Sequence, residues 1–197
     1  RGMGKPIKLR DGTSVEVRAL TRADADESFA FFQKLQPEDQ AYLRVKVIDR
    51  KIVEQRLQKN ANVRRIAAVV EGKIIADAAL ELNPYGWKRH LAEYRIIVAS
   101  DYKRLGLGMV MAGELYELAI KEKVEEMVVE LMSPQVEAKK IFERLGFKQE
   151  AVMKNMVMDV NGRKQDLILM RCNLDEIWNK IETYYEEFES LGSLETV

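Results

Sequence analysis

The sequence predicts a mixed α/β fold (α+β with a mixed sheet), in which a central twisted β-sheet of about seven strands is flanked by helices and followed by an extra C-terminal helix. The chain has 197 residues, of which 47% are hydrophobic and only 4 are proline, so it can build a substantial core. Segments with strand and helix periodicity alternate along it. The length fits one generous domain with an appendage, which we place at residues 3–172 and 173–197.

Period-two alternation and turn signals locate the strands. Residues 14–20 alternate apolar and polar side chains after the turn signal Asp11-Gly12. Asn161-Gly162, the strongest short hairpin signal, joins the last two strands. The strands are expected at residues 14–20, 63–70, 74–82, 90–100, 126–132, 147–159 and 164–172. Within residues 90–100, alternation places one set of side chains on one face (Tyr94, Ile96, Val98) and the other set on the opposite face (Glu93, Arg95, Ile97).

Caps and helical spacing locate the helices. Thr21 with Asp24 three positions later predicts a helix start, and Gln36-Pro37 predicts its end. Residues 49–58 carry a second helical stretch, so two short helices should follow the first strand. Pro134 fits the first turn of a later helix, which Gly146 ends. The remaining helices are expected at residues 106–123, 134–146 and 174–191.

The last helix carries one apolar stripe, formed by Leu174, Ile177, Trp178, Ile181, Tyr185 and Phe188. Such a stripe usually packs on the core of its own chain. The alternative is a surface for a partner, such as a homodimer contact.

Composition excludes several classes of function. The chain has 32 basic and 32 acidic residues, so no overall field attracts nucleic acid or an anionic membrane. Cys172 is the only cysteine and His90 the only histidine, which argues against a disulfide framework and against a metal site. There is no apolar stretch of about 18 residues, and residues 1–10 lack the apolar middle of a signal peptide. We therefore expect a cytoplasmic protein.

Residues 93–109 carry the most informative pattern, because a strand passes through a basic loop into a helix with a glycine-rich first turn. Such a helix start presents unpaired backbone N–H groups and a partial positive charge, which suit a phosphate group. A dinucleotide fingerprint would require Gly or Ala where the chain has Met111, and no G-x-x-x-x-G-K-[ST] run occurs. A different phosphate loop or a plain structural turn remains.

The run Lys103-Arg104-Leu105-Gly106-Leu107-Gly108 resembles the [RQ]-x-x-G-x-[GA] loop of the GNAT superfamily of acyl-CoA N-acyltransferases, with Lys103 as a conservative departure. The order of elements over residues 14–172 also resembles that family's topology. The resemblance implies a GNAT domain at residues 3–172 and acetyl-CoA as cosubstrate. The stretch 92–101 looks most similar to GNAT modules of bacterial protein-lysine acetyltransferases.

A second motif strengthens the resemblance. Family members often read N-x-x-[AS]-x-x-x-[YF]-x-x-x-G-F, and this chain matches at Ala138, Phe142, Gly146 and Phe147, with Gln135 in place of Asn. Together the two motifs imply a set of coenzyme-binding residues: Ile96, Ile97, Val98, Lys103, Arg104, Leu105, Gly106, Leu107, Gly108, Met109, Gln135, Ala138, Lys139 and Phe142.

The resemblance also implies catalytic roles. An amine with a pKa near 10.4 must lose a proton before attack, and Glu93 is the candidate general base; its alternative is a salt-bridged strand residue. The backbone N–H of Val98 would stabilise the oxyanion. Phe142 stands where many members carry a proton-donating Tyr. The thiolate, with a pKa around 8.5, can leave unaided. Tyr94 or Tyr102 could substitute as the proton donor, but each is more simply a packing residue.

Three interpretations follow. The first is an N-acetyltransferase that acts on a primary amine, with a protein lysine favoured. The second is an acetyltransferase for small amines, and the third is a catalytically silent acyl-CoA-binding sensor or regulatory module. We expect the first helices and residues 83–90, with Tyr85 and Trp87, to recognise the acceptor.

Overall fold

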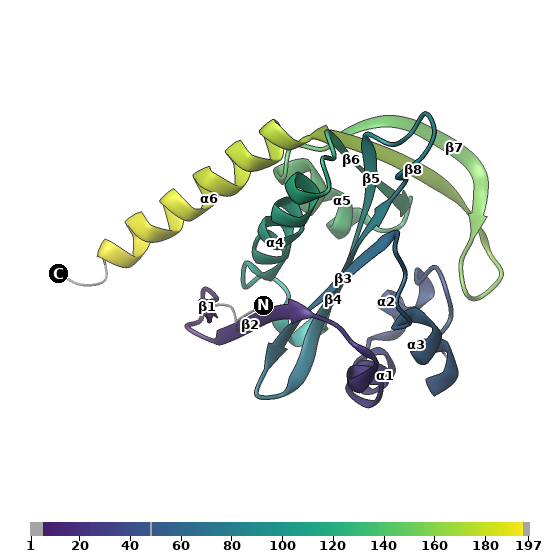
Figure 1. Ribbon diagram of the computed structural model, residues 1–197, viewed down its shortest axis with the longest axis horizontal. Helices are drawn as coiled ribbons and strands as arrows, with labels where there is room; N and C mark the ends of the chain where they lie inside the picture. The colour runs from purple at the N-terminus through teal and green to yellow at the C-terminus, as the bar shows by residue number, and fades with distance from the viewer. Residues whose placement is uncertain (1–5, 48, 195–197) are drawn as a thin grey trace.

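The computed structural model describes residues 6–47 and 49–194, and its centre is a sheet of eight strands in the order β1-β2-β3-β4-β5-β6-β8-β7 (Figure 1). The strands are β1 (Ile7–Lys8), β2 (Ser14–Ala19), β3 (Val63–Val70), β4 (Lys73–Leu82), β5 (Leu91–Val98), β6 (Glu126–Met132), β7 (Lys148–Met158) and β8 (Lys164–Asn173). The α-helices are α1 (Ala25–Gln33), α2 (Pro37–Ala41), α3 (Arg50–Arg56), α4 (Leu107–Lys121), α5 (Val136–Arg144) and α6 (Leu174–Leu194), with 3₁₀ turns η1 (Arg22–Asp24) and η2 (Ser100–Tyr102). The predicted mixed fold, including the extra C-terminal helix, is confirmed.

Three features differ from the sequence prediction. Pro134 does not lie in the first turn of α5, because the N-cap of that helix is Gln135 and Pro134 belongs to the preceding turn. Three α-helices, not two, follow the first long strand. α1 already ends at Gln33, three residues before the predicted stop at Gln36-Pro37, and Pro37 instead occupies the first position of α2, where a missing N–H costs nothing. The short strand β1 was not predicted, because two residues are too few for a periodic signal; Ile7 pairs there with Val15.

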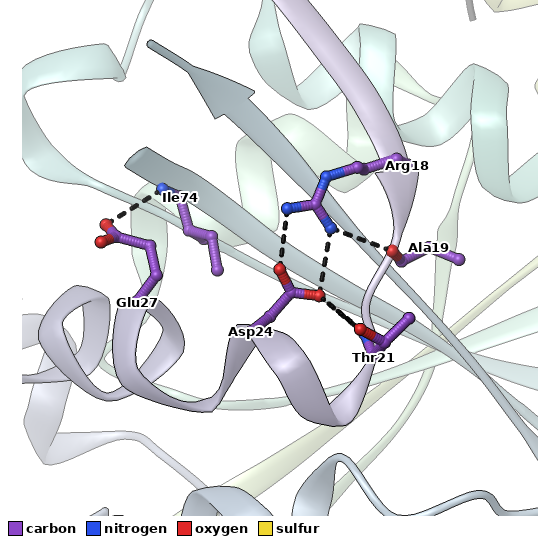
Figure 2. Close-up of polar contacts among 6 residues, drawn as sticks. All are labelled: Arg18, Ala19, Thr21, Asp24, Glu27 and Ile74. Atoms are coloured by element: carbon purple, nitrogen blue, oxygen red, sulfur yellow. Dashed lines mark hydrogen bonds and ion pairs between the residues drawn. The ribbon is translucent and has the colours of Figure 1, made fainter. Parts of the chain in front are cut away.

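The start of the first helical region has the predicted cap. The Asp24 carboxylate accepts a hydrogen bond from the Thr21 N–H at 2.8 Å and from Arg18 at 2.7 and 3.1 Å (Figure 2). The Ile74 N–H donates to Glu27 at 3.3 Å, which ties α1 to β4 (Figure 2). The first turns of this helical region are therefore held to β2 through Arg18 and to β4 through Ile74.

β5 is the strand at which the pairing in the sheet changes from antiparallel to parallel. It pairs with β4 in the antiparallel sense from Ala92 to Val98, but with β6 in the parallel sense only from Leu91 to Glu93. Beyond Glu93 the β5–β6 ladder ends. We call residues 94–98 of β5, on the side toward β6, the open edge.

Two hydrophobic cores lie on opposite faces of the sheet. One contains side chains of α4, α5 and α6 and includes Tyr94, with Ile96 and Val98 packed against it. The other contains side chains of α1 and α3, and Ile97 packs there. Figure 1 shows α1, α2 and α3 grouped away from α4 and α5. The predicted alternation along β5 is confirmed.

Helix α6 runs alongside α4 and packs on the first core (Figure 1). Leu174, Ile177 and Ile181 are buried, which confirms the core-packing role for this part of the stripe. Trp178 stacks on Tyr116 with 5.2 Å between ring centroids. The side chain of Phe188 lies outside the described residues. No helix in residues 6–47 and 49–194 is both long and apolar enough to cross a membrane.

Candidate active site

The glycine loop joins the end of β5 to the start of α4. Arg104 and Gly106 have left-handed backbone angles, with φ of 66° and 85°. Met109 and Val110 both donate to the carbonyl of Gly106, at 3.1 and 3.2 Å. Within the described chain, no backbone carbonyl accepts from the N–H groups of residues 104–108. The loop therefore presents consecutive free donors at a helix N-terminus, which is the arrangement that binds phosphate.

The two cations of the loop differ in environment. Lys103 Nζ lies 2.7 and 2.8 Å from the two carboxylate oxygens of Asp39 on α2, so its charge is already compensated. Ser100 Oγ donates to the same carboxylate at 3.3 Å. Arg104 is exposed. Lys103 thus ties α2 to the loop, whereas Arg104 is the cation that an arriving anion can reach.

Helix α6 reaches the same loop, which sequence reasoning missed. A Cβ placed on Gly106 would collide with the hydroxyl of Tyr184, and Arg10 lies 5.4 Å above the Tyr184 ring. The backbone N–H of Arg10 donates to Leu105 at 3.1 Å. Tyr184 is off the predicted stripe, so the periodicity of α6 gave no signal for this contact. Gly106 is needed both for its φ and for its closeness to Tyr184.

The second motif lies next to the first. A Cβ on Gly108 would be 3.7 Å from Ile141 on α5. Gln135 is the N-cap residue of α5, and its side-chain oxygen accepts from the Met132 N–H at 2.8 Å. Ala138 packs on the first core, and Phe142 is buried. The tertiary structure therefore brings both predicted motifs to one place.

The side chains of the remaining coenzyme-site candidates lie on different faces of the sheet and differ in how deeply they are buried. Ile97 faces the second core, so its side chain is on the opposite side of the sheet from α4 and α5. Leu107 is buried in the first core and Lys139 is ion-paired with Glu143 at 3.6 Å, while Leu105 and Met109 are partly buried. Their predicted coenzyme contacts remain predictions.

The backbone of the open edge points toward β6. Ala99 donates its N–H to Ile75 on the β4 side at 2.8 Å. Because N–H groups alternate in direction along an antiparallel ladder, those of Ile96 and Val98 point the other way. They lie beyond the last β5–β6 pair, so the open edge offers backbone donors and acceptors next to the glycine loop.

On the opposite face, Glu93 belongs to a network of charges. Its carboxylate is ion-paired with Arg44, from the segment between α2 and α3, and lies 3.8 Å from Arg95. Arg44 also lies 3.3 Å from Glu130 on β6, and Arg95 lies 2.7 Å from Glu81. Glu93 is thus salt-bridged in this structure, with 21% of its side chain exposed. Desolvation by burial, then the charge of Arg95, lowers the pKa of Arg44; desolvation lowers the pKa of Arg95 as well.

Two hollows flank this region. One, of about 220 Å³, lies between α1, the Arg44 segment and the β7–β8 hairpin, and is lined by Phe32, Gln33, Gln40, Leu43, Lys46, Val47 and Val160. The other is open, and Trp87 lines it with Glu122 and Lys123 at the C-terminal end of α4. Tyr85 and Trp87 are almost fully exposed. The first hollow is the one on the Glu93 face.

Known proteins resemble this arrangement. The model of the acetyltransferase (GNAT) family matches residues 22–147. The GNAT domain of PAT from S. lividans is 18% identical, with 85% of this chain and 95% of that chain covered and a TM-score of 0.72. The α-N-protein acetyltransferase RimL, solved in complex with coenzyme A, is 13% identical, with 82% and 95% covered and a TM-score of 0.72. A chimera of spermidine N-acetyltransferase SpeG from Vibrio cholerae and hSSAT is 20% identical, with 84% and 98% covered and a TM-score of 0.69.

Proposed function

The chain belongs to the acetyltransferase (GNAT) family, and we propose that it acetylates the side-chain amine of a protein lysine, with Glu93 as the general base. Family membership makes it an acetyl-CoA-dependent N-acetyltransferase. The observation that carries the proposal is the division of β5. A single strand presents an open edge beside the phosphate-binding loop and, on the face of α1 and α3, the Glu93 carboxylate in a network of charges.

The coenzyme is assigned to the glycine loop and the open edge. The free N–H groups of residues 104–108 suit its diphosphate, and the side chain of Arg104 adds positive charge. Gly106 and Gly108 let the backbone approach closely. The backbone groups of Ile96 and Val98 suit the amide-rich arm of the coenzyme, and the Val98 N–H is the proposed donor to the carbonyl oxygen that becomes negative during attack.

The acceptor amine is assigned to the Glu93 face. At pH 7 under about one part in a thousand of a lysine amine is uncharged, so a base that removes its proton is needed. Glu93 is already bound to a cation, the guanidinium of Arg44. We place the acceptor ammonium where Arg44 now lies, between Glu93 and Glu130, so that binding exchanges one cation for another and brings the amine to its base.

A protein acceptor is favoured by what surrounds this position. The hollow of about 220 Å³ has amide and apolar side chains from α1 and the Arg44 segment, which suit the backbone of a peptide. The similarity to RimL, an α-N-protein acetyltransferase, agrees with a protein acceptor. The similarity to a spermidine acetyltransferase favours a small polyamine as the second candidate, because the acidic side chains of Glu81, Glu93 and Glu130 would also attract it.

The test is the release of free thiol from acetyl-CoA with lysine peptides and, in parallel, with spermidine. We expect turnover with peptides, and we expect Glu93→Gln to lower kcat at least about tenfold because a positioned base contributes roughly 10²- to 10⁴-fold. The matched control is Glu54→Gln, which alters a carboxylate on α3 that is ion-paired with Arg50 and not with Arg44, and it should keep turnover within about threefold. Acetyl-CoA should raise the melting temperature of all three proteins.

Each contrary outcome has a definite meaning. An unchanged rate in Glu93→Gln removes Glu93 as the base. Turnover with spermidine but not with peptides replaces the lysine acceptor by a polyamine. A rise in melting temperature with no thiol release from any amine replaces the enzyme by a silent acyl-CoA-binding module.

A further inference from the structure

The hydroxyl of Tyr94 is buried without a partner. Tyr94 is 3% exposed, and its oxygen has no hydrogen-bond partner in the described chain. Buried hydroxyl groups are nearly always hydrogen-bonded, since leaving one unsatisfied is unfavourable. A phenylalanine would fill the same space without that penalty. The hydroxyl therefore requires an explanation outside the packing of the core.

The position of Tyr94 supplies an explanation for its unpartnered hydroxyl. Tyr94 is the first residue of the open edge, immediately after the last β5–β6 pair at Glu93. Its ring lies 5.4 Å from the ring of Phe142 on α5 and 6.4 Å from that of Phe147, both measured between centroids. These neighbours are hydrocarbon rings and offer no donor. Tyr94 thus holds a lone hydroxyl where the open edge meets α5.

The other unpartnered buried atoms belong to different surroundings. Ser28 Oγ is on α1, and Arg65 Nε and Arg95 Nε belong to side chains that face the acidic residues Asp77 and Glu81. These lie on the face of α1 and α3, together with Glu93. On the coenzyme face, Tyr94 has the only unpartnered buried side-chain polar atom found in residues 6–47 and 49–194.

We propose that the Tyr94 hydroxyl donates a hydrogen bond to the sulfur of the departing coenzyme thiolate. The inference rests on the proposed function, because it takes the open edge as the site of acyl transfer. In the step, the acceptor ammonium first gives one proton to Glu93. The amine nitrogen then bonds to the carbonyl carbon, the carbon–sulfur bond breaks with its electron pair going to sulfur, and the second proton of the nitrogen passes to water. The thiolate leaves with that charge, Tyr94 keeps its proton, and water later protonates the sulfur.

Hydrogen-bond donation suits Tyr94 better than proton transfer. Burial raises the pKa of its hydroxyl well above its ordinary value of 10.0, whereas a thiol has a pKa of about 8.5. Moving the proton from oxygen to sulfur would therefore be uphill. A donor that stays protonated and is already desolvated can stabilise a developing negative charge without reorganisation.

The first test compares Tyr94→Phe with Tyr116→Phe, a matched change on the far side of α4 against Trp178. We expect Tyr94→Phe to lower kcat about 10- to 100-fold with little change in the KM for acetyl-CoA, as for loss of one hydrogen bond to a charged group. Its melting temperature should equal or exceed that of the wild type. Tyr116→Phe should turn over at the wild-type rate.

The second test does not need turnover. We expect coenzyme A to bind the wild type more tightly at pH 9.5 than at pH 7, relative to Tyr94→Phe, because the hydrogen bond favours the ionised thiol. The expected gain in relative affinity, measured by calorimetry, is about tenfold. Equal pH dependence in the two proteins overturns the inference, as does an unchanged kcat or a kcat loss accompanied by a lower melting temperature. Absence of turnover in the wild type with any amine would overturn the proposed function alone.

Discussion

The two faces of β5 differ in the kind of group they hold. On the face of α4 and α5, Tyr94, Ile96 and Val98 are apolar or nearly so, and apart from the Tyr94 hydroxyl the polar groups that this strand offers a ligand come from its backbone. On the opposite face, the strand contributes the charged Glu93 and Arg95. Alternation within one strand therefore separates a site that suits a long, mostly neutral coenzyme arm from one that suits a cationic amine.

The two faces of β5 also differ in the interactions that hold the surrounding segments in place. The coenzyme face is closed by hydrophobic packing and by α6, which reaches the glycine loop through Tyr184. The acceptor face is held by ion pairs that a competing cation can exchange, such as Arg44 with Glu93 and Glu130. We expect substitutions on the first face to act on coenzyme binding and those on the second to act on the acceptor.

The largest expected effect is on the coenzyme face. In Gly106→Asp, the new side chain meets the Tyr184 hydroxyl, adopts an unfavourable φ of 85° and places a negative charge beside the phosphate site. We expect binding of coenzyme A to be abolished in calorimetry. The matched control is Gly72→Asp, which has a φ of 77° and open space around it. It should lose about 1–3 kcal/mol of stability from backbone strain yet bind coenzyme A normally. Normal binding by Gly106→Asp would refute the assignment of the loop.

A smaller effect is expected on the acceptor face from Arg44→Ala. If the acceptor ammonium takes the place of the Arg44 guanidinium, removing that guanidinium relieves competition and should lower the KM for a lysine peptide about three- to tenfold, with the affinity for acetyl-CoA unchanged. Arg64→Ala, whose partner Glu122 follows α4 on the opposite face of the sheet, serves as the control. A rise in the acceptor KM of Arg44→Ala would show that Arg44 binds the acceptor instead.

The last prediction concerns stability and not activity, and it lies in the scaffold of the acceptor face, at Asp24 (Figure 2). Its hydrogen bonds with Arg18, then those with Thr21, lower the pKa of the carboxyl below its ordinary 3.8. A lowered pKa stabilises the fold above that ordinary value, and the contribution is lost as pH falls through the folded-state pKa. Asp24→Asn should therefore cost about 1–2 kcal/mol in urea unfolding at pH 7, and progressively less below about pH 4.

The control for this prediction is Asp26→Asn. Asp26 is largely exposed and pairs only at the surface with Arg50, so its loss should cost less than about 0.5 kcal/mol. An equal loss of unfolding free energy in both variants would contradict the stabilising role of the Asp24 carboxylate. A loss in Asp24→Asn that does not vary between pH 3 and 7 would contradict it as well.

Much of the fold could be predicted from the sequence because its signals are local. The alternation along β5, the capping box at Thr21 and the Asn161-Gly162 turn each depend on residues within a few positions of one another. Pro37 shows the limit of such signals, because the pattern indicated a helix end there, whereas α1 has already ended at Gln33 and Pro37 begins α2.

The candidate site was only partly predictable. The glycine loop and Glu93 were found by spacing and by resemblance, since both lie in one continuous stretch of chain. The partners that define their environment come from remote segments: Arg44 is 49 residues before Glu93, and Tyr184 reaches Gly106 from the last helix. No local pattern encodes such pairs.

By itself, the sequence determined which segments form strands and helices, which side chains of β5 share a face and where a phosphate can bind, because these properties follow from periodicity and from the free N–H groups of a helix start. Only the tertiary structure decided that β5 leaves β6 after Glu93, that Arg44 covers the candidate base and that the hydroxyl of Tyr94 is buried without a partner. These depend on how distant segments share space, which is set by the packing of the whole chain and not by the order of neighbouring residues.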